Sequence, residues 1–398
     1  MTSGSWKALI GLLVLTMGTS IITPLLPLYR AHFHLSNGTA TLLFVTYTVT
    51  VAPTMLVAGN LADRLGRKRL LLPAMVIMSL ASIVFGLADS VALLFVGRVL
   101  QGLAIGGFLG VGTAFVVDHA DAHSKASAAA LAGVFFRVGF GLGPGLGGLL
   151  AEYGPNPRHL PFFGHLAAMA VGIVAVATAA ETLRRDPKTV HPPFRIRIGV
   201  PQEQARGFLS FVAPATFLMS FVEGTVLSVV PLFVVEDLHV HNLAVVGSLG
   251  FLVLAMGGLA PLFLRGRDPR LCIIGGVIGS SLLSFLVVAS SAVSSAAVVV
   301  IAAAAIGLIN GAILYGGTVI CGTIVPLVER GKLMSVLYMC AYSGTVPTVA
   351  LGYLSDGIGL TKTLLIFSCA ALALALFVVT VGRRLFPVVI PYRGPEPA

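Results

Sequence analysis

Three ionisable residues that could do chemistry lie inside long apolar runs: Glu223, Arg98 and Arg137. Burial disfavours the charged form of a carboxyl, whereas an arginine within about 4–6 Å favours it. If Glu223 met Arg137 or Arg98 in one conformation and lost that partner in another, the proton affinity of its carboxyl would change. We therefore assign proton coupling to these three residues. A permanent structural ion pair, or a glutamate that stays protonated, is the alternative.

A second group of polar residues occupies isolated positions in the apolar runs, where an unneeded hydroxyl would only weaken contact with apolar surroundings. Residues four apart share one face of a helix, as Thr19 and Thr23 would, and Thr46 and Thr50. Each side chain could instead bond its own helix or a neighbouring one. We predict a moderately apolar cavity with hydrogen-bonding walls, lined by Thr19, Thr23, Thr46, Thr50, Asn310, Tyr338 and Tyr342.

The composition decides the broad class of protein. The chain is 57% apolar and 10% charged, with a mean hydropathy of +0.99, which cannot describe a water-facing globular surface. The composition therefore indicates an integral membrane protein. Its apolar runs predict an all-α fold, because they reach the roughly 20 residues that a helix needs to cross a bilayer. We predict twelve membrane-spanning helices, near residues 7–28, 38–62, 69–89, 91–117, 126–151, 160–181, 207–235, 241–265, 270–291, 294–325, 331–356 and 361–382.

The positive charges indicate the orientation, because cytoplasmic loops retain Lys and Arg. With both termini in the cytoplasm, 20 of the 25 Lys and Arg residues lie on that side, among them Arg184, Arg185, Lys188, Arg195 and Arg197. The opposite side holds Arg30, Arg158 and Lys362, and Arg98 and Arg137 lie within the membrane. The net charge of +10 is thus explained by topology, with attraction to anionic lipid as a side effect, and needs no nucleic-acid partner.

Residues 182–206 are the one stretch with soluble composition, and they divide the chain into two sets of six runs. We predict an N-terminal bundle at 1–181, a cytoplasmic linker at 182–206, a C-terminal bundle at 207–382 and a cytoplasmic tail at 383–398. An offset near 204 aligns residues 26–29 with 230–233, and residues 143–154 with 346–357. This degenerate repeat favours two pseudo-symmetric six-helix bundles around a central site.

A short polar turn, Gly59-Asn-Leu-Ala-Asp-Arg-Leu-Gly-Arg-Lys-Arg69, separates the second and third runs. Its glycines suit a tight turn, its aspartate a helix end, and its arginines a membrane surface. The turn resembles the signature loop of the major facilitator superfamily. That resemblance implies a cytoplasmic gate that latches one conformation, with simple anchoring of positive charge as the alternative. The residues assigned to the gate are Gly59, Asp63, Arg64, Gly66, Arg67 and Lys68.

Two further motifs carry the resemblance. The run Arg98-Val-Leu-Gln101-Gly102 is similar to the pattern of the family's fourth helix, which implies a structural or proton-relay role for Arg98. The run from Gly139 to Gly148 resembles the family's antiporter signature. Its glycines recur every four residues, so another helix can approach closely, and its proline weakens the helix. Arg137 points away from that glycine face. The motif residues are Gly139, Gly143, Pro144, Gly147 and Gly148.

The resemblance implies a twelve-helix secondary transporter with the fold of the major facilitator superfamily, similar to its drug:proton antiporter branch. We expect proton-coupled export of small amphipathic compounds by alternating access, in a monomer within the bacterial cytoplasmic membrane. The expected partners are a small-molecule substrate, protons and the lipid bilayer. A facilitator or importer of a small metabolite is the alternative, and a membrane sensor or scaffold that no longer transports is another.

Other kinds of chemistry find little support in the sequence. Asp118-His119-x-Asp121-x-His123 and Glu236-Asp237-x-His239-x-His241 have types of residue that bind metals, but both fall in expected loops, where polarity explains them. No phosphate-binding loop, HExxH or GxSxG pattern is present. We therefore expect no enzyme activity, metal or cofactor.

Overall fold

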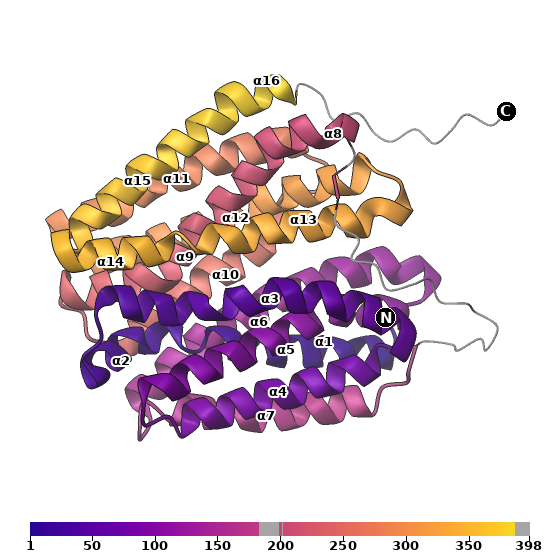
Figure 1. Ribbon diagram of the computed structural model, residues 1–398, viewed down its shortest axis with the longest axis horizontal. Coiled ribbons are helices and arrows are strands. Elements are labelled where there is room, and N and C mark those ends of the chain that lie inside the picture. The colour runs from indigo at the N-terminus through magenta and orange to yellow at the C-terminus, as the bar shows by residue number, and fades with distance from the viewer. Residues whose placement is uncertain (183–198, 201, 387–398) are drawn as a thin grey trace.

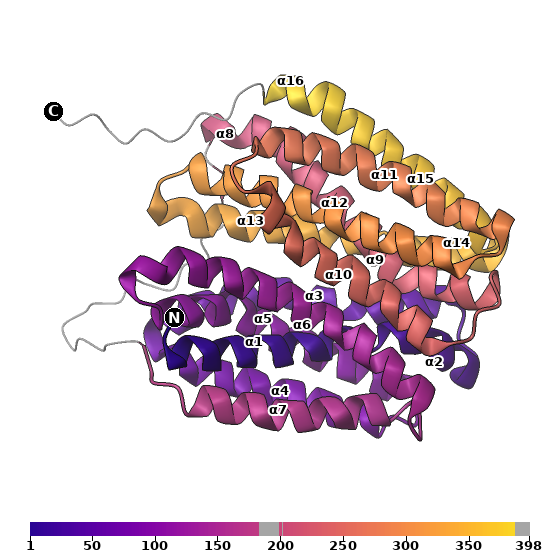
Figure 2. The same ribbon diagram turned by 180° about the vertical axis from the view of Figure 1, so that it is seen from behind.

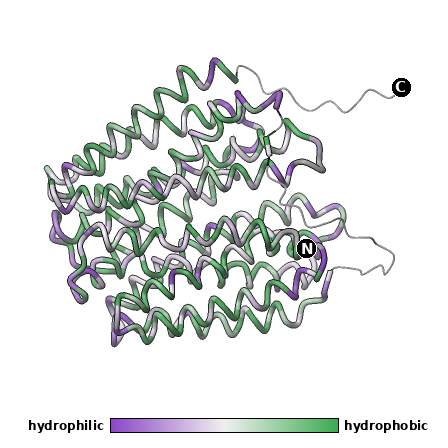
Figure 3. The backbone as a smooth tube through the Cα atoms, viewed as in Figure 1, coloured by the Kyte–Doolittle hydropathy of each residue, from purple (hydrophilic) through white to green (hydrophobic). Residues whose placement is uncertain are grey.

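The computed structural model describes residues 1–182, 199–200 and 202–386, and this part of the chain is helical without strands. It contains twelve helices or helix groups long and apolar enough to cross a membrane, as predicted. They lie side by side as two layers (Figure 1), and hydrophilic residues gather mainly at the two ends of the layers (Figure 3). The predicted linker and tail fall mostly outside the described residues, including Arg184, Arg185, Lys188, Arg195 and Arg197.

The lower layer in Figure 1 contains the first six spans. The first span is broken into three pieces, the fifth begins with the short helix η2, and the other four are single helices. In chain order the elements are α1 (Ser3–Ser20), η1 (Thr23–Leu25), α2 (Leu26–Phe33), α3 (Asn37–Leu65), α4 (Lys68–Gly86), α5 (Val91–Asp118), η2 (Ala122–Ser124), α6 (Lys125–Tyr153) and α7 (Leu160–Ala177).

The upper layer contains the last six spans. Two five-residue π-helical turns, η3 and η4, interrupt the first and last of them. The elements are α8 (Gln202–Gly207), η3 (Phe208–Val212), α9 (Ala213–Glu236), α10 (Leu243–Leu264), α11 (Pro269–Val293), α12 (Ala296–Thr323), α13 (Leu327–Thr345), α14 (Thr348–Ile358), α15 (Leu360–Phe377), η4 (Val378–Gly382) and α16 (Arg383–Leu385).

The first span continues beyond its predicted end because its prolines begin new helical segments. Pro24 lies in the first turn of η1 and Pro27 in the first turn of α2. A proline lacks the backbone N–H, but the first turn of a helix has no intrahelical acceptor for that group, so proline is tolerated there. The prolines therefore mark a break within the span, and the span ends at Phe33.

The two bundles contact each other mainly along two pairs of helices, α6 with α10 and α3 with α14. Figure 2 shows α10 running from its own bundle toward α2 of the other. We call the end of the molecule that carries α2, the start of α10 and the end of α14 the distal end. It lies opposite the N-terminus (Figures 1 and 2).

The glycines of the antiporter motif serve two different interfaces. A Cβ at Gly139 or Gly143 would collide with the backbone of α1, and Gly147 packs against Ile21, the residue directly after that helix. Gly148 instead faces α10 in the other bundle, where a Cβ would collide with the carbonyl oxygen of Leu243. The helix runs unbroken through Pro144, whose carbonyl oxygen lies against Gly247. The motif thus tightens the N-terminal bundle and also brings the two bundles together.

Candidate functional site

An ion pair between Arg137 and Glu223 links the two bundles near the middle of the molecule. Arg137 comes from α6 and Glu223 from α9, and their side chains are 9% and 13% exposed. Arg137 Nη1 donates to Glu223 Oε1 at 2.9 Å, and Nη2 donates to Oε2 at 3.3 Å. Two parallel donors on one carboxylate fix both distance and orientation. Of the two arginines that the sequence left open as partners of Glu223, Arg137 makes the contact in this conformation.

Two consecutive glycines of α10 make room for the arginine. A Cβ added at Gly258 would lie 2.9 Å from the Cβ of Arg137, and one added at Gly257 would lie 3.3 Å from its Cζ. Both distances are shorter than a comfortable contact between carbon atoms. Arg137 Nε has no hydrogen-bond partner among the described residues, so the pair with Glu223 is its principal polar contact.

A cavity of about 90 Å³ adjoins this ion pair. That volume has room for a few water molecules but lies well below the roughly 300–1,000 Å³ of sites for drug-sized ligands. Six aromatic side chains contribute to its wall, and Arg137 and Glu223 are the charged ones among the described lining residues. The wall is formed by Phe44, Tyr47, Phe136, Arg137, Phe140, Met219, Ser220, Glu223, Gly224, Leu227, Leu254, Leu314, Tyr338, Ala341, Tyr342 and Thr345.

The structure brings only part of the predicted cavity lining to this wall. Tyr338 and Tyr342 line the cavity, whereas Thr19, Thr23, Thr46, Thr50 and Asn310 do not. Thr46 and Thr50 donate to carbonyls of their own helix, as hydroxyls in apolar helices commonly do. Asn310 donates to the Met219 carbonyl at 3.2 Å. Thr19 and Thr23 are buried in the N-terminal bundle, without a hydroxyl partner among the described residues.

Arg98 holds three helices of the N-terminal bundle together. It is completely buried, and its guanidinium lies over the ring of Tyr47 with 4.3 Å from Cζ to the ring centroid. The neighbouring Gln101 donates to the Gly18 carbonyl at 2.8 Å. Arg98 donates to the carbonyls of Leu43 (3.0 Å), Thr19 (2.8 Å) and Phe44, and to Gln101 Oε1 (2.8 Å).

These contacts explain why a cation is stable there. The carbonyls of Gly18 and Thr19 lie at the end of α1, just before the break in the first span. Carbonyls at a helix end lack intrahelical donors and carry partial negative charge, which a cation offsets. Arg98 and Gln101 therefore cap α1. In this conformation the contacts of Arg98 are structural, and its assignment to proton coupling stays a prediction.

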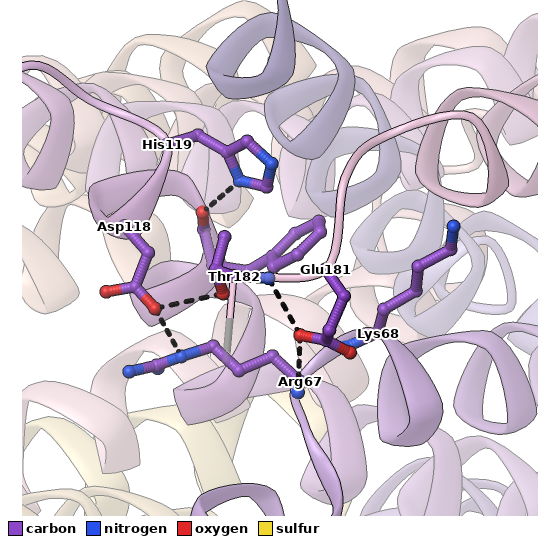
Figure 4. A network of polar contacts seen from close by, with 7 residues as sticks. Arg67, Lys68, Asp118, His119, Glu181 and Thr182 are labelled. Carbon is purple, nitrogen blue, oxygen red and sulfur yellow. Dashed lines mark hydrogen bonds and ion pairs between the residues drawn. The ribbon is translucent and has the colours of Figure 1, made fainter. Parts of the chain in front are cut away.

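The predicted gate loop is tied to its own bundle. The Glu181 carboxylate accepts from the backbone N–H groups of Arg67 at 3.2 Å and Lys68 at 3.1 Å, which begin α4 (Figure 4). Arg67 Nε pairs with Asp118 Oδ2 at 2.6 Å, and Thr182 donates to the same oxygen at 3.1 Å. A carboxylate at a helix N-terminus satisfies free donors and complements the helix dipole.

The remaining gate residues are consistent with a tight turn. Gly66 has φ +101°, a conformation that other residues rarely adopt, and it lies directly against the Glu181 carboxylate. Lys68 Nζ donates to the carbonyls of Ala179 at 3.0 Å and Ala177. Arg64 lies in the last turn of α3. The side chain of Asp63 and the surroundings of Gly59 are outside the described part of the structure. The gate function of the loop stays a prediction.

Sequence reasoning missed Glu181 and the role of Asp118. Asp118 was not predicted to pair with Arg67, yet it is the partner of that residue. Glu181 lies at the end of the sixth predicted span, about 110 residues from the loop that it caps. The available signal was an acid at a helix end on the same predicted side of the membrane as the basic turn.

Comparison with known proteins identifies the family. The model of the Major Facilitator Superfamily matches residues 8–348, most of the chain. The chain belongs to this superfamily. The resemblance of the gate loop and the two motifs is thereby confirmed at the level of the family. A chain of this superfamily with twelve candidate spans is a multi-pass membrane protein.

Individual relatives in this superfamily include bacterial drug-resistance proteins. The chain is 29% identical over 168 residues to multidrug resistance protein 2 of Bacillus subtilis, which is 42% of this chain and 40% of that protein. It is 28% identical over 172 residues to the quinolone resistance protein NorA of Staphylococcus aureus, 43% of this chain and 42% of that protein. The matched regions thus span less than half of these relatives.

Solved structures of transporters share the fold across nearly the whole chain. A peptide transporter POT in complex with sulfate superimposes with a TM-score of 0.80 at 14% identity, covering 98% of this chain and 96% of that one. A bacterial homologue of the human lysosomal transporter Spinster superimposes with a TM-score of 0.71 at 16% identity, covering 96% and 95%. At such identities the likeness concerns the fold alone.

Proposed function

We propose that this superfamily member is a proton-coupled exporter of small amphipathic compounds that works by alternating access. The observation that carries the proposal is the Arg137–Glu223 ion pair, which lies across the boundary between the bundles and in the wall of the cavity. An ionisable pair within a membrane is a default candidate for a proton pathway. The names of the bacterial relatives, which refer to multidrug and quinolone resistance, support export of drug-like compounds.

The ion pair couples protonation to movement of the bundles. When Glu223 is ionised, the bidentate contact with Arg137 holds α6 against α9. A proton on Glu223 removes its negative charge and leaves Arg137 as a cation that favours water or another acceptor. The two bundles can then separate at this point. Release of the proton on the other side of the membrane restores the contact.

The substrate class follows from the cavity wall. Aromatic rings offer large apolar faces, which bind flat or apolar compounds by burial and stacking. Phe136 and Phe140 come from the same helix as Arg137, and Tyr338 and Tyr342 come from α13 in the other bundle. A substrate must therefore contact both bundles. The cavity has to enlarge severalfold before it holds such a compound, and separation of the bundles supplies that volume.

We infer that both termini lie in the cytoplasm and that the distal end faces outward, from the strong excess of Lys and Arg near the opposite end. Short loops and the bacterial relatives favour the bacterial cytoplasmic membrane. We infer a monomer as the working unit, since one chain supplies both bundles and the whole described wall of the cavity.

The test uses wild type and Glu223→Gln, expressed at matched levels in an efflux-deficient bacterium. Tolerance to toxic cations, neutral drugs and anions is compared, and proton flux is followed in vesicles. We expect wild type to confer tolerance to some compounds and the variant to lose it. Glu203→Gln is the matched control, because this exposed glutamate in α8 lies in the same span but far from the cavity.

The results separate the possibilities. Tolerance that survives Glu223→Gln would keep export and remove Glu223 from proton coupling. If wild type protects against no compound but accumulates a metabolite in vesicles, the importer or facilitator replaces the exporter.

A further inference from the structure

Two carboxylates at the distal end reach across the boundary between the bundles to the first residues of a helix. Asp356 of α14 accepts from the backbone N–H groups of Asn37 at 2.7 Å and Gly38 at 3.0 Å, at the start of α3. Glu152 of α6 accepts from the N–H of Leu243 at 2.7 Å, at the start of α10. Such N–H groups have no acceptor within their own helix. In both cases the opposite bundle supplies it.

The two contacts share one design. Each capped helix also has an ordinary N-cap residue, whose side chain accepts from the N–H three residues later: Ser36 from Thr39 at 3.1 Å, and Asn242 from Val245 at 3.0 Å. The N-cap residue thus accepts from the third helical N–H, and the carboxylate of the opposite bundle accepts from the first and, in α3, also from the second. The acceptor from the opposite bundle is in place at each helix start only while the bundles are in contact.

The sequence carries the same unit twice. Glu152 lies one helical turn after Gly148, and Asp356 lies one turn after Gly352. Both pairs are separated by 204 residues, the offset of the internal repeat. A Cβ at Gly148 would collide with the Leu243 carbonyl, and one at Gly352 would collide with the Thr41 side chain. Each glycine therefore allows the close helix approach that brings the following acid onto a helix N-terminus.

A third contact at the same end joins Arg30 of α2 to Glu236 of α9 at 3.0 Å. Both side chains are about one-third exposed, so solvent weakens this ion pair. The two backbone caps differ from this ion pair. A carboxylate at a helix start is stabilised both by hydrogen bonds from the free N–H groups and by the positive end of the helix dipole. The caps are the stronger candidates for holding the bundles together.

We propose that Glu152 and Asp356 form a two-fold symmetric latch that keeps the bundles closed at the distal end. In alternating access that end must open, and the opening has to release both caps together because the same two bundles carry them. The latch goes beyond the proposed exporter function, since it requires only that the bundles separate there and does not depend on substrate or proton.

The test measures the opening directly in the purified full-length protein. The native cysteines Cys272, Cys321, Cys340 and Cys369 are replaced, and spin labels are attached at His32→Cys and His241→Cys, exposed positions near the distal ends of the two bundles. Pulsed electron paramagnetic resonance gives the distribution of distances between the labels. We expect Glu152→Gln and Asp356→Asn each to raise the ratio of long to short distances roughly fivefold, and the double variant to raise it further.

The matched control is Asp237→Asn. Asp237 also accepts from a backbone N–H at the distal end, that of Thr361 at 3.1 Å, but both residues belong to the C-terminal bundle. The Asp237→Asn substitution should leave the distances between the spin labels unchanged. Glu152→Asp and Asp356→Glu keep the charge, so the folded variants should keep the short label-to-label distances of wild type. Unchanged distances in both latch variants, or an equal opening in Asp237→Asn, would overturn the latch.

Discussion

Arg137 Nη1 and Glu223 Oε1 lie 2.9 Å apart, although the two residues belong to different bundles and are separated by 86 positions in the chain. Neither bundle can therefore rotate away from the other at this point without breaking a buried ion pair. In the proposed mechanism this contact connects the protonation of Glu223 to the positions of the two bundles.

The first prediction concerns the cost of leaving one charge of this pair alone. Arg137→Gln should destabilise the protein by roughly 3–5 kcal/mol, because Glu223 then remains buried without its cation. The double variant Arg137→Gln with Glu223→Gln should be more stable than Arg137→Gln alone, since neither charge is left. Thermal unfolding in detergent measures both. Equal stability of the single and double variants would mean that the pair is solvated and energetically unimportant.

The second prediction concerns the glycines that give Arg137 its position. Gly258→Ala should cost about 1–3 kcal/mol through overpacking and should displace the guanidinium from Glu223. Substrate-driven proton flux in vesicles should fall together with the unfolding temperature. Gly275→Ala in α11 is the control, because a Cβ there meets no atom within 4 Å. Full activity of Gly258→Ala would show that the space beside Arg137 accommodates a methyl group.

The third prediction separates a structural role of Arg98 from proton coupling. Arg98→Lys keeps the charge but cannot direct donors to three carbonyls and an amide at once, so we expect a loss of roughly 3 kcal/mol or more. The proton flux per substrate transported by the folded fraction should stay unchanged. If that ratio falls while thermal stability is retained, Arg98 acts in proton coupling and its carbonyl contacts are secondary.

The fourth prediction concerns the cap on α4. Glu181→Gln should weaken the start of this helix by about 1 kcal/mol, because a neutral amide accepts less strongly from two N–H groups at a helix N-terminus. Trypsin should then cut the purified protein faster after Arg67, Lys68 and Arg69. Glu203→Gln removes an acid elsewhere on the same side of the molecule and should not change the cutting rate. Equal rates for all three proteins would exclude the cap as a restraint on this loop.

Much of the fold was predictable because spanning helices are determined by local composition. All twelve predicted spans overlap the spans of the structure. The first span was predicted too short at both ends: it begins at Ser3 and runs to Phe33 through Pro24 and Pro27. The π-helical turns at Phe208–Val212 and Val378–Gly382 were not predicted, since their apolar sequence suits an ordinary α-helix equally well.

The candidate site was predictable only in part. Glu223 and Arg137 stood out because charges in apolar runs are rare, but the choice between Arg137 and Arg98 depended on how the bundles pack. The threonines of the first two spans were expected in the cavity. Their hydroxyls bond their own helices or lie between helices, and periodicity cannot distinguish those faces from a cavity wall. Glu152 and Asp356 escaped notice because each acts on a helix from the other half of the chain.

The pairing of Arg137 with Glu223 also limits how much net charge one transport cycle can move across the membrane. Among the described lining residues the cavity wall carries these two charges, so in the proposed mechanism its net charge alternates between zero and one positive charge. One proton per cycle is then the capacity of the wall. Exchange of one proton for a neutral compound moves one net charge across the membrane. A membrane potential of 100 mV then contributes about 2.3 kcal/mol to the driving force of that exchange. Exchange for a monovalent cation moves none, so its accumulation should follow the pH gradient alone.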